Sequence, residues 1–217
     1  MKRRGFWAVL SCAVACCAVV GASLIAGSLV AADKDGEGWV TIFDGKSLDG
    51  WKINESKESW KLADGALIAN GPRSHAFYVG DAKPFVNFEF KAEVMTKPNS
   101  NGGIFIHTKY QEDGWPKQGY ETQVNNTYKP DPQKTGGLYN TVKVLTPPAT
   151  DGEYWTQHIT VQGKHIVVKI NDKVVVDYTE PEKVEGTVKL SEGTFALQAH
   201  DPGSTVYYRN IRVKRLP

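Results

Sequence analysis

Cysteine is absent from almost the whole sequence. Cys12, Cys16 and Cys17 lie within the first 17 residues, and residues 33–217 contain none. From residue 33 onward the sequence therefore excludes disulfides, thiolate metal ligands and a cysteine nucleophile. Without disulfides this part of the chain must be stabilised by a hydrophobic core, and about 185 residues are enough to form one.

The cysteines belong to an N-terminal segment with the pattern of a secretory signal. Met1-Lys2-Arg3-Arg4 is basic, residues 6–30 are apolar, and Val30-Ala31-Ala32 supplies the small residues of a cleavage site. This order predicts a signal peptide over residues 1–32, and hence an exported protein that is periplasmic or extracellular. The apolar run is also long enough to cross a bilayer, so an uncleaved membrane anchor formed by residues 6–30 is the alternative.

A strong excess of charge of one sign is missing too. The full sequence carries a net charge of +2, and loss of Lys2, Arg3 and Arg4 with the signal leaves −1. A near-neutral domain gives no reason to expect nucleic acid as a partner, or a membrane beyond the N-terminal segment.

Long helical periods are also lacking after residue 38. Apolar residues alternate with polar ones instead, as at Phe88, Phe90 and Ala92, which is typical of half-buried strands. Many short strands with Gly and Pro between them predict an all-β fold, a two-sheet concanavalin-like jelly-roll sandwich formed by one domain over residues 33–217. The longest irregular stretches are 110–119 and 128–137, and loops of this kind on a rigid sheet usually shape a site.

The strand between those two stretches has one strongly polar face. Side chains alternate along a strand, so within residues 119–126 Glu121, Gln123 and Asn125 share one side of the sheet. One carboxylate between neutral amides predicts a surface that binds a sugar and carries a single acid or base. An ordinary solvent-facing strand is the alternative interpretation.

Two other predicted strands carry polar side chains that a jelly roll would place nearby: His107, and Gln198 with His200. On the concave face of one sheet these groups could bind a sugar without a desolvation penalty. Trp115 and Tyr120 are expected to supply an aromatic platform, because a pyranose ring presents apolar C–H faces.

Each of these residues has a structural alternative. His107 could be a partly buried histidine bonded to a backbone carbonyl, and His200 could anchor the turn that follows it. Glu121 could form a surface ion pair with Lys109 or Lys117, which would contribute little.

A second carboxylate is lacking where a common sugar hydrolase would have one. Ordinary glycosidases flank the scissile bond with two acids, and jelly-roll glucanases commonly place both on one strand. Here Gln123 and Asn125 are amides where the second acid would be expected. The polar strand therefore argues against a plain glucanase.

Several motifs resemble one known family in order along residues 33–217. They are Phe43-Asp44-Gly45-Lys46-Ser47-Leu48-Asp49-Gly50-Trp51, Asn101-Gly102-Gly103-Ile104, Gly119-Tyr120-Glu121-Thr122-Gln123, Thr135-Gly136-Gly137-Leu138-Tyr139, Gly193-Thr194-Phe195-Ala196-Leu197-Gln198-Ala199-His200 and Val206-Tyr207-Tyr208-Arg209-Asn210-Ile211. The series resembles the 3-keto-disaccharide hydrolases, also described as 3-keto-glucoside lyases and hydratases. The resemblance implies a concanavalin-like jelly roll, an exported bacterial protein, and action on glycosides already oxidised to a ketone at C3.

Such a substrate needs one base, a group that holds an enolate oxygen, and an acid for the leaving group. We expect Glu121 to be the base that removes the C2 proton. His107 and His200 would hold the enolate oxygen or protonate the leaving group, and Gln123 and Gln198 would bind sugar hydroxyls.

Two alternatives stay open at this point. His107, Glu121 and His200 could instead bind a divalent metal ion that polarises the ketone, although no close-spaced metal motif is present. The same polar face could also serve a non-catalytic carbohydrate-binding, lectin-like domain, or be incidental in a structural envelope domain.

Overall fold

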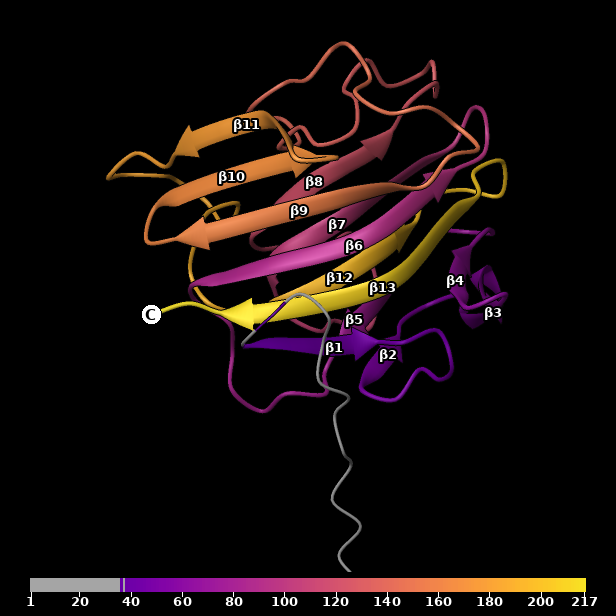
Figure 1. The fold of residues 1–217 in the computed structure, drawn as a ribbon, viewed down its shortest axis with the longest axis horizontal. Helices are drawn as coiled ribbons and strands as arrows, with labels where there is room; N and C mark the ends of the chain where they lie inside the picture. Colours follow the sequence, from indigo (N-terminus) through magenta and orange to yellow (C-terminus); the bar gives the residue numbers. More distant parts are fainter. Residues whose placement is uncertain (1–35, 37) are drawn as a thin grey trace, which may run out of the picture.

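The computed structural model describes residues 36 and 38–217, which form a β-sandwich with one short 3-10 helix, η1 (Lys57–Ser59) (Figure 1). The predicted signal or anchor over residues 1–32 lies outside the described residues. The strands are β1 (Trp39–Phe43), β2 (Trp51–Ile53), β3 (Trp60–Ala63), β4 (Ala66–Ala69), β5 (Ser74–Tyr78), β6 (Phe88–Thr96), β7 (Asn101–Thr108), β8 (Tyr120–Asn125), β9 (Trp155–Gln162), β10 (His165–Ile170), β11 (Lys173–Thr179), β12 (Thr194–Ala199) and β13 (Val206–Arg215). In this part of the chain no helix is long and apolar enough to cross a membrane.

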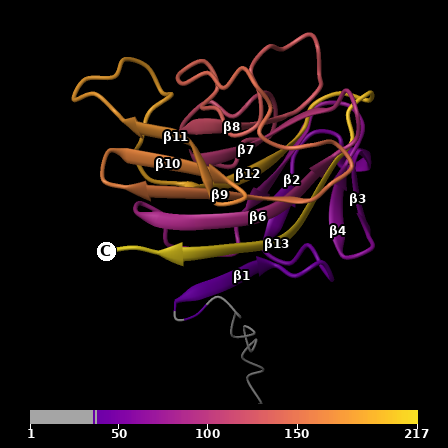
Figure 2. The ribbon, with the colours of Figure 1, turned by 45° about the horizontal axis from the view of Figure 1, so that its top comes forward.

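The strands form two antiparallel sheets. The larger sheet has eight strands in the order β11-β10-β9-β6-β13-β4-β3, with β1 also paired to β13. The smaller sheet has five strands in the order β2-β5-β12-β7-β8. In Figure 1 the larger sheet covers the smaller one, and Figure 2 shows the loops that follow β8 clustered at one edge of the sandwich. The prediction of an all-β fold with two antiparallel sheets is confirmed.

The core lies between the inner faces of the two sheets. Phe88 and Phe90 of β6 are fully buried against Phe195 of β12, with ring centroids 5.0 and 4.7 Å away. Each such side chain stabilises the fold by about 1.5–3 kcal/mol on burial. The alternation predicted for β6 is confirmed, because its burial pattern has strict period two.

The outer face of the smaller sheet is partly apolar as well. Phe77, Phe105 and Ala196 are buried there as a separate cluster on three adjacent strands. The same face carries Glu121, which lies opposite Phe105 of that cluster, and Gln198, which lies opposite His75. This outer face therefore offers an apolar floor next to polar side chains.

A β-bulge interrupts the alternation of β7 at His107. The pairing of β7 with β12 shifts register between Phe105 and Thr108, and His107 has a positive φ of 53°. Two glycines pack against this bulge, because a Cβ at Gly119 or Gly193 would collide with the backbone of His107. The extra residue turns the His107 side chain toward the core instead of the outer face.

Candidate active site

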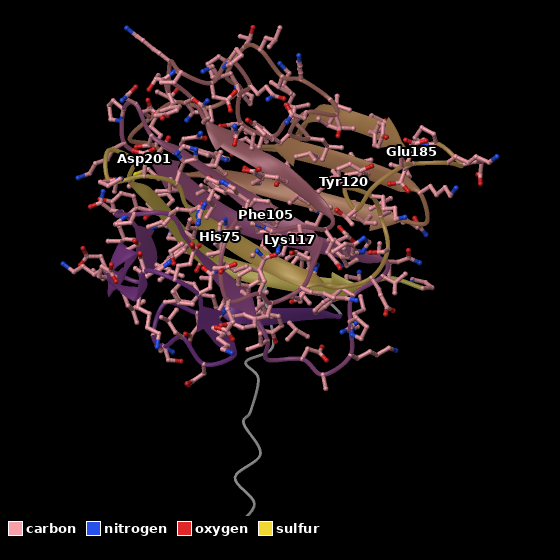
Figure 3. The ribbon with its side chains drawn as sticks, turned by 180° about the vertical axis from the view of Figure 1, so that it is seen from behind. His75, Phe105, Lys117, Tyr120, Glu185 and Asp201 are labelled. Atoms are coloured by element: carbon pink, nitrogen blue, oxygen red, sulfur yellow. The ribbon has the colours of Figure 1, made fainter. Side chains whose placement is uncertain are left out.

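A groove of about 610 Å³ lies on the outer face of the smaller sheet. Its floor is formed by β7, β8 and β12, and its walls come from loops after β7, β8 and β11. The residues that line it are Asn101, Phe105, Trp115, Pro116, Gly119, Glu121, Gln123, Asp131, Tyr139, Asn140, Thr141, Val188, Gln198 and His200. Figure 3 looks onto this sheet, with Phe105 near its centre and His75 beside it. The two irregular stretches singled out in the sequence both contribute to the walls.

The Glu121 carboxylate is the central ionisable group of the groove floor. Its Oε1 accepts a hydrogen bond of 2.9 Å from Nε2 of Gln198, two strands away. The intervening strand contributes Gly103, where a Cβ would lie only 2.9 Å from Cδ of Glu121. Glycine at this position is therefore what lets the carboxylate lie over β7 and reach Gln198.

The surroundings of Glu121 raise the pKa of its carboxyl group from 4.5 to about 8. Desolvation is the largest cause, and the negative charge of Asp131 acts in the same direction. The hydrogen bond from Gln198 opposes both, because it stabilises the ionised form. A carboxyl group shifted this far in an open groove has the properties of a catalytic acid or base.

Gln123 lies in the groove as predicted, and it contacts an acid that the sequence analysis did not identify. Its Nε2 donates to Oδ2 of Asp131 at 3.1 Å. The other oxygen of Asp131 accepts the backbone N–H of Gln133 at 2.8 Å, so both carboxylate oxygens are held. Asp131 therefore adds a second carboxylate to the groove, from a loop and not from the strand.

Asn125 shares the polar face but anchors a loop instead of lining the groove. It is fully buried, and its Nδ2 donates to the backbone carbonyls of Asp131 and Gln133 at 3.0 and 2.9 Å. Its Oδ1 accepts the backbone N–H of Tyr128 at 2.9 Å. The contact with substrate expected for Asn125 is not supported by this position, since its side chain is saturated by the loop that carries Asp131.

His200 and Trp115 lie together at another part of the groove. Their ring centroids are 5.5 Å apart, and His200 is also 5.6 Å from the ring of Tyr128. Nδ1 of His200 is 2.7 Å from Oδ2 of Asp201, which fixes the ring. Both side chains are partly exposed, so the structure brings His200, Trp115, Gln123, Gln198 and Glu121 into one groove as expected.

His75, on β5, packs beneath this aromatic end of the groove. Its ring lies 5.5 Å from both Trp115 and Phe105, and neither ring nitrogen has a hydrogen-bond partner among residues 38–217. Desolvation lowers the pKa of His75 to about 3, so the ring is neutral over the physiological range. It therefore behaves as an aromatic support for Trp115.

His107 does not join Glu121 and His200, and the expectation of a shared site is wrong for this residue. It is 1 % exposed, its Nε2 is 2.9 Å from the carbonyl of Val86, and its Nδ1 accepts the backbone N–H of Ser191 at 3.2 Å. Its ring packs against Phe88 of the core, 5.4 Å away. The β-bulge is the physical reason, because strict alternation would have placed His107 on the outer face.

Tyr120 is likewise not part of the aromatic platform. It is 1 % exposed on the core side of β8, and its hydroxyl donates to Oε2 of Glu180 at 2.8 Å. Alternation along β8 explains this, since Tyr120 and Glu121 must point to opposite faces. Of the two aromatic residues expected to stack on a sugar, only Trp115 lines the groove.

The residues present do not fit the metal site considered above. Within the described part of the chain, no group of three or more His, Cys, Asp and Glu side chains is arranged to hold a metal ion. His107 is sealed in the core, so it cannot complete a ligand set with Glu121 and His200.

Sequence reasoning missed several groove residues, and Asp131, Tyr139 and Phe105 matter most. Asp131 lies in the irregular stretch 128–137, and Tyr139 ends the motif Thr135-Gly136-Gly137-Leu138-Tyr139. Both signals were visible, but neither segment could be placed beside β8 without the backbone pairing. Phe105 could have been identified from its alternation with Ile104 and Ile106.

Comparison with known proteins agrees with this fold. A solved structure from Parabacteroides distasonis, of a protein assigned as a glycosyl hydrolase, superposes with a TM-score of 0.70 at 22% identity, covering 83% of this chain and 95% of that one. A carbohydrate-binding module from Bacillus subtilis superposes with a TM-score of 0.55 at 14% identity, covering 76% and 95%.

Sequence comparison is more specific. A 3-keto-disaccharide hydrolase from Bacteroides thetaiotaomicron is 26% identical over 84% of this chain and 80% of its own length. The profile of the family described as "3-keto-alpha-glucoside-1,2-lyase-like domain" matches residues 38–214, which is most of the chain. The family resemblance predicted from the motifs, and with it the enzyme class, is confirmed: this chain belongs to the 3-keto-alpha-glucoside-1,2-lyase-like domain family.

Proposed function

We propose that this protein cleaves glycosides whose sugar carries a ketone at C3, by elimination followed by rehydration, with Glu121 as the base. The observation that carries the proposal is the Glu121 carboxyl at the floor of a sugar-sized groove, with a pKa raised to about 8. A base of that strength suits removal of a proton next to a ketone. Family membership supports the substrate class.

The reaction needs no oxidant or reductant. Glu121 takes the proton from C2, the C–H electron pair forms an enolate with the C3 ketone, and the enolate expels the glycosidic oxygen from C1. Water then adds its hydroxyl to C1, its remaining proton balances the one taken up by the departing aglycone oxygen, and Glu121 returns a proton to C2. The net change is hydrolysis of the glycosidic bond, and the carboxylate is regenerated.

The other groove residues divide the remaining tasks. Nδ1 of His200 is paired with Asp201, so Nε2 is the nitrogen through which His200 would hold the enolate oxygen. Gln198 keeps Glu121 in place through its hydrogen bond, and Gln123 would bind sugar hydroxyls. Trp115 offers an aromatic face to a sugar ring. His107 has no part in this scheme.

A non-catalytic carbohydrate-binding function is the second candidate, favoured by the fold likeness to the Bacillus subtilis module. A binding groove gains nothing from a strongly basic carboxylate, because an uncharged amide would bind hydroxyls at a lower desolvation cost. The perturbed pKa of Glu121 therefore supports the enzyme over the binder.

The test measures turnover of a 3-keto-glucoside and of the same glucoside without the ketone. We expect the wild type to cleave only the keto form, and Glu121→Gln to lose at least about 10²-fold of that activity. Glu112→Gln is the matched control, because Glu112 pairs with Lys52 outside the groove. Binding of the unoxidised glucoside without cleavage of either compound would favour the carbohydrate-binding function.

We further propose that the chain is exported and that residues 1–32 are its signal. The basic start, the apolar run and the small residues before Asp33 support this. N-terminal sequencing of the protein recovered from its host distinguishes a chain that begins near Asp33 from one that keeps residues 6–30 as an anchor.

A further inference from the structure

The segment after Lys134 runs antiparallel to β8 and extends the smaller sheet by a short irregular strand. The backbone N–H of Tyr139 donates to the carbonyl of Glu121 at 2.9 Å, and that of Gln123 donates to the carbonyl of Gly137 at 2.9 Å. Thr122 and Leu138 form an isolated β-bridge between these bonds. The register therefore places Tyr139 directly opposite Glu121.

Alternation then fixes the side to which Tyr139 points. Thr122 and Leu138 are fully buried on the core side, so Glu121 and Tyr139 must both face outward. Both line the groove, and both are only half-buried. Residues opposite each other in an antiparallel pair have Cβ atoms about 4.5–5.5 Å apart, which is close enough for both to meet one substrate.

The charges around Tyr139 favour its protonated form. Partial burial, Asp131 and Glu121 together raise the pKa of the Tyr139 hydroxyl. Asp131 is itself fixed by Gln123 and by the backbone N–H of Gln133. Tyr139 therefore keeps its proton at the pH where Glu121 is ionised, which is the pairing that an acid and a base in one active site require.

We propose that Tyr139 is the acid that protonates the departing glycosidic oxygen, from the side of Glu121 opposite to His200. This assignment rests on the proposed function. His200 directly follows β12, and Tyr139 lies beyond β8 on the other side of Glu121. The base therefore lies between the residue that holds the enolate oxygen and the residue that protonates the aglycone.

The proton balance of the cycle closes with these two residues. As the C1–O bond breaks, the Tyr139 hydroxyl gives its proton to the aglycone oxygen and becomes a phenolate. When water adds to C1, the phenolate takes a proton from that water. Glu121 takes the C2 proton in the first half and returns one in the second, so both residues end as they began.

A leaving-group comparison tests the assignment. A methyl aglycone departs as a strongly basic alkoxide and needs a proton donor, whereas a p-nitrophenyl aglycone departs readily as a phenolate. For Tyr139→Phe we expect kcat/KM for methyl 3-keto-glucoside to fall by about 10²-fold or more, and that for the p-nitrophenyl compound to fall by only about threefold. Tyr110→Phe is the matched control, because Tyr110 bonds to Glu112 outside this groove.

The outcomes separate the two proposals. Equal losses on both substrates, or no loss on either, would overturn the role of Tyr139 while leaving the elimination intact. Failure of the wild type to cleave either keto-glucoside would instead overturn the proposed function, and with it this inference.

A second variant tests the acid role of Tyr139 through the pH profile, which would not shift if Tyr139 were only structural. Asp131→Asn keeps the tyrosine but removes one negative charge beside it. The alkaline limb of kcat/KM for the methyl compound should then move to lower pH, since the pKa of Tyr139 falls. An alkaline limb that stays in place in Asp131→Asn, and persists in Tyr139→Phe, would contradict the assignment.

Discussion

The Glu121 carboxylate lies directly over Gly103. Because β7 has no side chain at this position, the Glu121 side chain of β8 can extend across β7 toward β12. A Cβ at Gly103 would be 2.9 Å from Cδ of Glu121. Through this gap Glu121 accepts its 2.9 Å hydrogen bond from Gln198. The position of the base therefore depends on the absence of a side chain as much as on the groups that bind it.

Gly103→Ala should displace the carboxylate and reduce activity far more than stability. The new Cβ would meet the end of the flexible Glu121 side chain, which can move. We therefore expect the free energy of unfolding to fall by less than about 1.5 kcal/mol, while turnover of a keto-glucoside falls by at least about tenfold. Gly102→Ala is the matched control. Its Cβ would meet Tyr208 and Val206 at 3.0 Å on the core side, so it should lower the melting temperature and spare turnover of the folded protein. The reverse pattern would be inconsistent with the proposed role of Gly103.

The pH dependence of catalysis should report the Glu121 carboxyl. The base must be ionised, so kcat/KM should rise with pH to a plateau above about 8. Asp131→Asn removes a negative charge that raises this pKa, and should move the rising limb to lower pH. Gln198→Leu removes the hydrogen bond that lowers the pKa of Glu121, and should move the rising limb to higher pH. A limb near pH 4.5 in all three proteins would contradict the raised pKa of Glu121.

Stability should respond to pH in the opposite sense. The pKa of Glu121 is about 8 in the folded protein and 4.5 for a free carboxyl, so between these values the folded state binds more protons than the unfolded state. Ionisation therefore destabilises the fold as pH rises, with a slope of at most about 1.4 kcal/mol per pH unit. Glu121→Gln should unfold at a higher temperature than the wild type at pH 8 and at nearly the same temperature at pH 4.5. Equal melting temperatures at pH 8 would contradict this.

Much of the fold followed from the sequence because period-two patterning survives in the structure. The alternation at Phe88, Phe90 and Ala92 predicted β6 and its buried face, and the same rule placed Glu121 and Gln123 on one outward face. Gln198 on β12 and His200, the residue just after that strand, join them in the groove because they follow the same alternation.

The errors arise where local geometry breaks that rule or lies outside it. His107 was predicted on the outer face, but one extra residue in β7 reverses the alternation and turns its side chain toward the core. The residues of β7 alone do not indicate this bulge, because the glycines that pack against it are distant in sequence. Tyr120 was assigned to a platform although its own strand position directs it into the core. Asp131 and Tyr139 were missed because their placement depends on backbone hydrogen bonds between a loop and β8, which no short-range pattern encodes.

Substituting each of the two histidines separately tests the placement of His107 in the core and of His200 in the groove. His107→Asn keeps a residue that tolerates the left-handed backbone but loses the contact with Val86, so it should cost about 1–3 kcal/mol and leave kcat/KM of the folded protein nearly unchanged. His200→Asn should do the opposite and lower turnover with a small change in melting temperature. If His107→Asn abolished turnover in a folded protein, the core assignment of His107 would be wrong.

The most direct test of the whole account is the isotope effect on cleavage of a 3-keto-glucoside that carries deuterium at C2. Elimination breaks the C2–H bond, whereas direct hydrolysis leaves it intact. We predict slower cleavage of the deuterated substrate, most clearly in Glu121→Asp, where a shortened base makes proton removal the slow step. Equal rates for the two substrates in both proteins, with cleavage still proceeding, would contradict it.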